Sequence, residues 1–480
     1  MKSARKNKLL FILFAAILAF PIVISVWPFI FSSAMFAEWD LSPQYYLLQS
    51  MIENLRNFRI TGYDKSVGLG YPTFQFYGPF FYAVVGLTYL ITKPLFALFS
   101  SELNSNAVLN TYIFALPFLF IYAFHFAAKS LFPRLKNSLL PTLFAMIYLF
   151  YPVEGSLGII GLHDVLLHGH VAAFLGLTIT LFFIGSLEAC ITKPSPKKIA
   201  LSTALLTSLF LTHVLGSIAI GFYCVARFLF ANKEGKKKIV LVSFGAFLLA
   251  SWWIVPFYND LWITGSGKAS GYDSPFLPLL PGLSTLAKCS LMPFSTWVLD
   301  LPFVSLFVGA SCLYGIYKLI EVKNYFLPVF FLPFLILVPT NRGYQISNIS
   351  LHYYRFISFA VLIFFLISTY GFSLVLAHSQ ERRLSYTLAW SLLACVYLYN
   401  LFHLTPLQGP KFSNCSNLTP KDPPKVLSGI NESELISAIQ REGIKRVYSP
   451  PYFIAQDKLN SIHAYLSILA LHKSTEVFPG

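Results

Sequence analysis

Two carboxylates stand two residues apart near the start of the chain, in Glu38-Trp39-Asp40, directly after the apolar run 9–31. At this spacing in an irregular segment, both can reach one substrate, with one acting as a general base, or both can share a divalent cation. Acidic residues are scarce in the chain, so a pair at the end of an apolar run indicates chemistry at the edge of a membrane. The alternative is an interfacial acidic pair with only a topological role.

A second cluster, His163-Asp164-Val-Leu-Leu-His168-Gly-His170, holds three histidines and one aspartate in eight residues. Such side chains can bind zinc, and Asp164 together with Glu38 and Asp40 offers oxygen ligands for Mg²⁺ or Mn²⁺. Without a cation, His168 and Asp164 suit contact with a substrate or a phosphate group. A third interpretation is that these histidines are only hydrogen-bonded at the membrane interface.

Three further positions suit a phosphorylated lipid and a sugar. Arg355, in Leu351-His-Tyr-Tyr-Arg355-Phe, can pair with phosphate oxygens through two parallel N–H groups, or it can snorkel at a helix end. His213 interrupts a long apolar run, where an ionisable side chain indicates either a functional site or a buried, satisfied imidazole. Tyr77 belongs to Tyr71-Pro-Thr-Phe-Gln-Phe-Tyr77-Gly-Pro79, whose aromatic rings can stack on sugars or anchor in lipid headgroups.

The composition is that of a protein with many membrane-spanning helices. Of the 480 residues, 56% are hydrophobic and 11% are charged, whereas about a quarter are charged in a typical soluble domain. The net charge is +15, but the basic residues stand in short clusters between apolar runs, as in cytoplasmic loops, so nucleic acid is not an expected partner. None of the six cysteines forms a Cys-x-x-Cys pair, which argues against a metal–thiolate site.

Apolar runs of spanning length, about 20 residues, predict the helices. They occupy 9–31, 78–99, 106–127, 139–153, 171–190, 199–231, 239–258, 301–320, 325–340, 356–377 and 386–404. The run 199–231 is long enough for two short helices with a break near Thr212-His213. If 78–99 lies in the interface instead of crossing, six basic clusters fall on the cytoplasmic side: the N-terminus, 129–136, 193–198, 233–238, 318–323 and 382–383.

We therefore expect an all-α polytopic membrane protein with about eleven transmembrane helices, a cytoplasmic N-terminus and an extracytoplasmic C-terminus. The membrane domain covers 1–404, and its first outer loop, 32–105, carries the candidate active site and an interfacial helix. The polar residues 405–480 are expected to form a small extracytoplasmic α/β tail. A Walker loop, Gly-x-Ser-x-Gly and His-Glu-x-x-His are all missing from the sequence, which disfavours an ATP-driven pump or a standard hydrolase.

The order of these motifs resembles a known group of proteins. An acidic loop after the first helix is followed by Gly70-Tyr-Pro-Thr-Phe-Gln-Phe-Tyr77-Gly-Pro79, His168-Gly-His170, Thr212-His213, Ser251-Trp-Trp-Ile-Val-Pro256 and Tyr354-Arg355-Phe356. This order is similar to that of the bacterial and archaeal membrane proteins grouped under the label "6-pyruvoyl-tetrahydropterin synthase-related domain". Those proteins in turn resemble the C superfamily of multispan glycosyltransferases.

The resemblance covers about residues 10–380 and implies a glycosyltransferase-C-like fold, a polyprenyl-phosphate sugar donor and an active site in the first outer loop. By this analogy Asp40 and Glu38 match the acidic motif, and Asp164 matches a second-loop acidic residue. We expect a hexosyltransferase of the cell envelope, in which Arg355, His213 and His168 hold the lipid phosphate. The alternatives are a transporter or flippase for a lipid-linked or polysaccharide envelope intermediate, and an inactive scaffold for envelope assembly.

Overall fold

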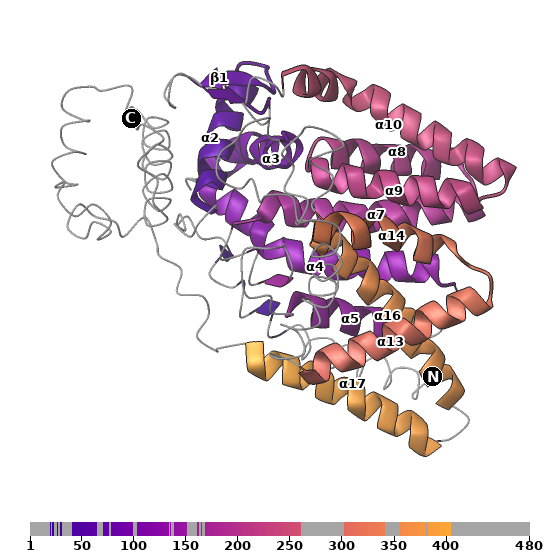
Figure 1. Ribbon diagram of the computed structural model, residues 1–480. Helices are drawn as coiled ribbons and strands as arrows, with labels where there is room; N and C mark the ends of the chain where they lie inside the picture. The colour runs from indigo at the N-terminus through magenta and orange to yellow at the C-terminus, as the bar shows by residue number, and fades with distance from the viewer. Residues whose placement is uncertain are drawn as a thin grey trace, which may run out of the picture.

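The computed structural model describes most of the membrane domain. The described residues are 20, 22, 23, 26, 29, 30, 41–64, 71–75, 78–98, 103–133, 135, 139–150, 161, 162, 165, 169–260, 302–340, 356–379 and 383–404. The elements are α2 (Leu41–Arg56), β1 (Gly62–Asp64), β2 (Tyr71–Thr73), α3 (Phe80–Ala97), α4 (Ser105–Leu131), α5 (Leu139–Leu149), α7 (Val171–Thr192), α8 (Pro196–Phe210), α9 (Val214–Phe230), α10 (Lys233–Asp260), α13 (Pro302–Glu321), α14 (Phe326–Thr340), α16 (Ile357–Ser379) and α17 (Arg383–Leu404). Figure 1 shows them as a bundle of helices with one short hairpin.

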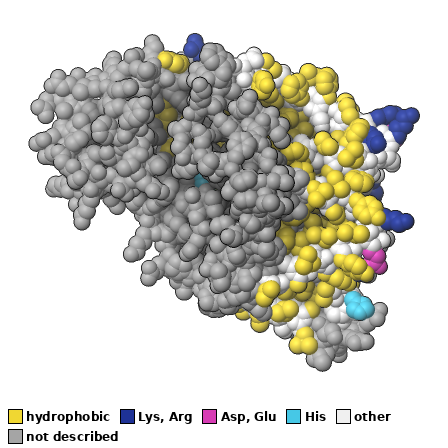
Figure 2. Space-filling view, in the orientation of Figure 1, with side chains coloured by type: hydrophobic (Ala, Val, Ile, Leu, Met, Phe, Trp, Pro, Cys, Tyr) yellow, Lys and Arg dark blue, Asp and Glu magenta, His cyan; other side chains and the backbone are white. Residues whose placement is uncertain are grey.

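Apart from α2, the described helices coincide with predicted apolar runs. Five of the described helices, α3, α4, α7, α10 and α16, are long and apolar enough to cross a membrane. Helix α10 exposes one apolar face, on which Phe244, Leu248 and Trp252 recur at every fourth position. Such a face suits contact with lipid, and Figure 2 shows a broad hydrophobic surface on the described part of the chain. The protein is therefore a multi-pass membrane protein.

The predicted break in the run 199–231 is confirmed. Helix α8 ends at Phe210 and α9 begins at Val214, so the two form a helical hairpin around a three-residue turn. Ser195 caps α8 by accepting a hydrogen bond from the backbone N–H of Lys198, and His213 caps α9. The polar pair Thr212-His213 thus ends one helix and starts the next.

The C-terminal end of α7 lies beside a lysine of α8 and a lysine of α10. The Nζ of Lys238 donates to the backbone oxygen of Ile191, and the Nζ of Lys198 donates to the backbone oxygens of Ala189 and Lys193. These cations therefore satisfy carbonyls at the C-terminal end of α7. Figure 2 shows most of the visible Lys and Arg side chains at one end of the described part. Two of the predicted basic clusters thus share one end of the bundle.

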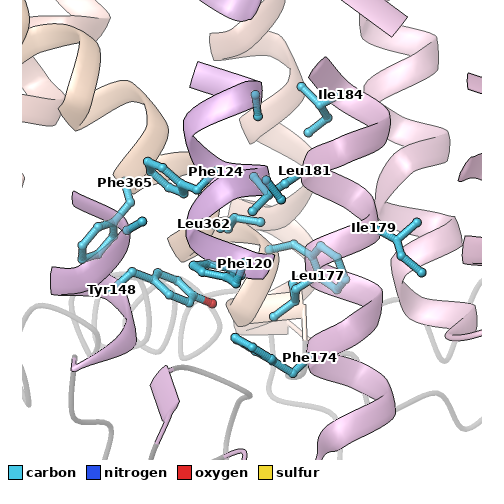
Figure 3. Packing of buried hydrophobic residues seen from close by; sticks show 14 of the residues in the cluster. Phe120, Phe124, Tyr148, Phe174, Leu177, Ile179, Leu181, Ile184, Leu362 and Phe365 are labelled. Carbon is cyan, nitrogen blue, oxygen red and sulfur yellow. The ribbon is translucent and has the colours of Figure 1, made fainter. Parts of the chain in front are cut away.

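Aromatic rings fill the centre of the bundle (Figure 3). The ring of Phe120 on α4 stacks on Tyr148 of α5 at 5.1 Å and on Phe174 of α7 at 5.0 Å between centroids. Tyr148 meets Phe365 of α16 edge-on at 5.4 Å. These contacts join the four helices α4, α5, α7 and α16, and each ring also buries a large apolar area.

The first loop, 32–105, contains more regular structure than the sequence predicts. It includes α2, the antiparallel hairpin β1–β2 and α3. Helix α3 coincides with the predicted interfacial segment 78–99 and also meets the length and hydropathy of a span. Its interfacial position, the count of eleven spans and the orientation of the termini stay predictions. The predicted α/β tail, 405–480, lies outside the described residues.

Candidate functional site

The turn between α8 and α9 carries His213, the predicted site residue that lies within the described part of the chain. Glu38, Asp40, Tyr77, Asp164, His168 and Arg355 lie outside the described residues, so their roles stay predictions. The segments that follow Tyr77, His168 and Arg355 in sequence are described, and their positions relative to His213 define the candidate site.

His213 is the N-cap residue of helix α9. Its Nδ1 accepts a hydrogen bond from the backbone N–H of Gly216 at 3.3 Å, which caps the first turn of α9. The hydroxyl of Thr212 donates to the backbone oxygen of Ser208 at 2.6 Å, so the preceding residue is fixed as well. An Nδ1 that accepts places the ring proton on Nε2 in the neutral imidazole. The half-buried His213 is therefore hydrogen-bonded within the fold, as one predicted alternative states, and its role in a functional site stays a prediction.

The segment after Tyr77 rests directly on this turn. The backbone N–H of Phe80 donates to the backbone oxygen of Leu211 at 2.9 Å. A Cβ on Gly78 would lie 2.5 Å from the oxygens of both Leu211 and Thr212, a distance that real Cβ atoms do not adopt. Glycine is therefore required at position 78 by the close approach of two backbones.

Phe74, in the same segment, is anchored to α10. Its backbone oxygen accepts a 2.7 Å hydrogen bond from the indole Nε1 of Trp253, and its ring packs 5.5 Å from the ring of Tyr82. The side chain of Phe74 is fully buried. The prediction that the aromatic residues of 71–79 stack on sugars or anchor in headgroups is therefore wrong for Phe74, because its ring is enclosed by protein.

The segments after His168 and Arg355 also reach the α8–α9 turn. His170 stands at the N-cap of α7, and a Cβ on Gly176, in the second turn of α7, would lie 2.8 Å from the Cβ of His213. On α16, the ring of Phe359 comes within 3.5 Å of the Cβ position of Gly216. Both helices therefore begin close to the turn that holds His213.

The fold has a counterpart among solved structures. A crystal structure of the oligosaccharyltransferase of Archaeoglobus fulgidus, in a complex with Zn and sulfate, matches this chain with a TM-score of 0.52 and 15% sequence identity. The chain therefore shares the overall fold of that structure. The match covers 94% of this chain and 61% of the archaeal chain, so this protein spans about three fifths of that neighbour's length. No protein-family model and no curated protein sequence matches the chain.

The expected glycosyltransferase-C-like fold agrees with this structural match, whereas membership of the C superfamily and of the 6-pyruvoyl-tetrahydropterin synthase-related group stays a prediction. Within the described ranges, no group of three or more His, Cys, Asp or Glu side chains is placed to hold a metal ion. The predicted cation ligands Glu38, Asp40 and Asp164 lie outside those ranges.

Sequence reasoning missed an ion pair inside the helical bundle of this chain. The Nε of Arg227 donates to Glu188 Oε1 at 2.7 Å, and its Nη2 donates to Oε2 at 3.2 Å. The hydroxyl of Tyr223 donates to the same Oε1 at 2.8 Å, and the guanidinium lies 5.1 Å from the ring centroid of Phe326. The signal was present, since Glu188 and Arg227 are ionisable residues within the apolar runs 171–190 and 199–231.

Proposed function

We propose that this protein is a membrane glycosyltransferase of the hexosyltransferase type, which transfers a sugar from a polyprenyl-phosphate donor to a hydroxyl acceptor on the extracytoplasmic face. The oligosaccharyltransferase fold supports a glycosyltransferase in general. The polyprenyl phosphate follows from the resemblance of the sequence motifs. The membrane-embedded bundle suits a donor whose lipid tail stays in the bilayer.

One observation carries this proposal. The segments that follow three predicted site residues meet around the α8–α9 turn: Gly78 and Phe80 follow Tyr77, α7 follows His168, and α16 follows Arg355. These segments are far apart in sequence, so only the tertiary fold brings them together. Their convergence on His213 supports a single site built from Tyr77, His168, Arg355 and His213.

The chemistry assigned to this site is a single displacement. The acceptor oxygen attacks the anomeric carbon as the bond between that carbon and the phosphate oxygen breaks, so the anomeric configuration inverts. Asp40, assisted by Glu38, takes the proton of the acceptor hydroxyl as a general base. The lipid phosphate leaves with the bonding electrons, and its charge is stabilised by Arg355, His213 and His168.

Tyr77 and Asp164 are assigned to the sugar and to a possible cation. Tyr77 packs on the sugar ring, and Asp164 contacts the sugar or joins Glu38 and Asp40 as a ligand of Mg²⁺ or Mn²⁺. A cation is not essential to the proposal, because a lipid monophosphate develops less charge than a nucleotide diphosphate on leaving. If one is bound, it would supply positive charge at the phosphate.

The buried pair Glu188–Arg227 bears on the alternative of a transporter or flippase, which would use ionisable residues within its spans. Both carboxylate oxygens of Glu188 already accept hydrogen bonds, and Glu188 lies in the last two turns of α7. Such a fully bonded pair fits a clamp between α7 and α9 better than a carrier site. We therefore favour the enzyme.

The test separates these functions in one preparation. Purified protein in liposomes is given a radiolabelled polyprenyl-phosphate sugar and a hydroxyl acceptor, and a second sample receives the corresponding nucleotide sugar. We expect labelled product from the lipid donor alone. Label that crosses the bilayer without transfer would favour the transporter, and product from the nucleotide sugar alone would contradict the proposed donor.

A further inference from the structure

The turn that follows α2 places a phenylalanine where glycine is usual. Helix α2 ends at Arg56, and two backbone hydrogen bonds close its C-terminal end. The N–H of Phe58 donates to the oxygen of Leu55 at 3.0 Å, and the N–H of Arg59 donates to the oxygen of Asn54 at 2.8 Å. This pair of bonds is a Schellman motif, whose left-handed position is most often glycine. Phe58 occupies that position with a φ of 55°.

The ring of Phe58 projects from the protein, since the residue is 99% exposed. It gains no burial that would offset the left-handed backbone. Phe74 also has a positive φ, but its ring is fully buried. A residue that breaks a local rule without a gain in packing indicates a contact with another molecule.

The exposed side chains next to Phe58 suit the surface of a membrane. They are two cations and two apolar side chains, Arg56, Arg59, Ile60 and Tyr63. Guanidinium groups pair with phosphate oxygens, and aromatic and aliphatic side chains enter the region between headgroups and acyl chains. Residues 56–63 are called the α2 turn below.

Hydrogen bonds tie the α2 turn to α10. Asn54, whose backbone oxygen closes the turn, donates through Nδ2 to Thr73 Oγ1 on β2 at 3.2 Å. The next residue, Phe74, accepts a hydrogen bond from Trp253 on α10 through its backbone oxygen. Gly62, within the turn, also pairs with Thr73 in the hairpin. Figure 1 shows β1 beside one end of α10.

This end of α10 has the features of a membrane interface. Trp253 stands twenty residues after Lys233, at the start of α10, and this separation is about 30 Å at 1.5 Å per residue. The hydrocarbon core of a bilayer is also about 30 Å thick. Trp252 and Tyr258 are exposed on α10 at this level, as in an aromatic belt. The α2 turn therefore lies at the interface opposite the lysines of α10.

We propose that the α2 turn is a membrane anchor. The apolar side chains of Phe58, Ile60 and Tyr63 enter the leaflet opposite the lysines of α10, and Arg56 and Arg59 pair with the phosphates of phospholipid headgroups. The two cations favour anionic lipids. The closed turn holds these side chains in place before they meet the lipid, which lowers the entropic cost of binding. This role does not depend on sugar transfer.

The first test uses benzoylphenylalanine, a photoreactive analogue of phenylalanine, at position 58. The full-length protein is placed in liposomes of phosphatidylglycerol and phosphatidylethanolamine, and adducts are identified by mass spectrometry. The same analogue at position 244 is the reference, because Phe244 lies on the exposed apolar face of α10. We expect phospholipid adducts at both positions. Adducts at 244 but none at 58, or adducts of 58 with protein alone, would overturn the proposal.

The second test separates anchoring from folding. Glycine adopts a positive φ freely, so Phe58→Gly should have at least the wild-type Tm in detergent micelles without phospholipid. Added phosphatidylglycerol should raise the Tm of wild type by at least about 3 °C more than that of Phe58→Gly. The double variant Arg56→Gln/Arg59→Gln should show the same reduced response, because it lacks the cations that hold the headgroups.

Lys323→Gly is the matched control. Lys323 ends α13 in the same motif, with a φ of 57°, and its N–H donates to the oxygen of Ile320 at 2.9 Å. Its side chain is exposed, so the variant changes the same backbone conformation outside the α2 turn. We expect a wild-type response to phosphatidylglycerol. Equal responses of wild type and Phe58→Gly, or equal losses in Phe58→Gly and Lys323→Gly, would overturn the proposal.

Discussion

The indole Nε1 of Trp253 donates a 2.7 Å hydrogen bond to the backbone oxygen of Phe74, 179 positions earlier in the chain. Phe74 adopts a φ of 62°, in the left-handed region, which costs a non-glycine residue about 1–2 kcal/mol. The bond from Trp253 and the packing of the buried ring offset that cost. This one contact fixes the segment that precedes Tyr77 against the bundle.

Replacing Trp253 with phenylalanine removes the donor and leaves the Phe74 carbonyl buried without this partner. We expect Trp253→Phe to lower the free energy of unfolding by about 1–3 kcal/mol. Trp252→Phe is the matched control, because Trp252 is 45% exposed on the apolar face of α10 while Trp253 is 2% exposed. Denaturation of both variants in the same detergent tests this, and equal losses would contradict the role given to the bond.

Gly78→Ala probes the contact between the segment 78–80 and the α8–α9 turn. The added methyl would lie 2.5 Å from the backbone oxygens of Leu211 and Thr212, so one of the two backbones must move. We expect sugar transfer to fall at least about tenfold through misplacement of Tyr77 and His213. The rate is measured with the lipid donor at saturation.

Gly221→Ala provides the comparison for this variant. Gly221 lies within α9, and beyond its chain neighbours and the nearby backbone of its own helix no atom comes within 4 Å of the position that its Cβ would take. We expect Gly221→Ala to retain wild-type transfer. Full activity in Gly78→Ala would show that the close approach at position 78 has no part in the site.

Removing one partner of the Glu188–Arg227 ion pair should destabilise the protein more than removing both partners. Arg227→Leu leaves the carboxylate of Glu188, whose side chain is 7% exposed, without its cation. We expect a loss of about 3–5 kcal/mol in the free energy of unfolding. The double variant Glu188→Leu/Arg227→Leu should recover most of this loss, because no unpaired charge remains buried.

The matched control is Lys237→Leu. This change breaks the ion pair between Lys237 and Glu234, whose side chains are both 64% exposed. We expect no measurable change in stability, since exposed pairs contribute little. Thermal unfolding of the three variants tests the assignment. A double variant as unstable as Arg227→Leu alone would indicate that Glu188 and Arg227 have separate partners.

The sequence predicts the helices well, because each membrane-facing helix leaves a long apolar run. The break at Thr212-His213 was found because two polar residues interrupt such a run. Hydropathy does not distinguish a helix that crosses the membrane from one that lies in the interface, so it leaves the position of α3 open. That distinction depends on tertiary packing against neighbouring helices.

Helix α2 was missed for a different reason. Tyr45, Leu48, Ile52 and Leu55 follow helical spacing, and Pro43 stands in the first turn, where proline is tolerated. The polar residues between them lower the hydropathy of the segment, so a search for apolar runs passes over it. Helix α2 buries these polar groups against partners on other elements, and those partners are not visible in the local sequence.

The candidate site was only partly predictable. Motif order drew attention to Gly78, Trp253 and His213, and the structure brings their segments together. The contacts themselves depend on pairing across more than a hundred positions, which a single sequence does not specify. The capping role of His213 was likewise hidden, although a side-chain acceptor just before a helix is a recognised N-cap signal.

The catalytic role of Asp40 is tested most directly by comparing initial rates of sugar transfer from a polyprenyl-phosphate donor in wild type, Asp40→Asn and Glu53→Gln. Glu53 is an exposed carboxylate on α2, thirteen residues after Asp40, and serves as the matched control. We predict that Asp40→Asn loses at least about a hundredfold in rate while remaining folded, and that Glu53→Gln keeps the wild-type rate. Wild-type transfer by folded Asp40→Asn would contradict the proposed mechanism.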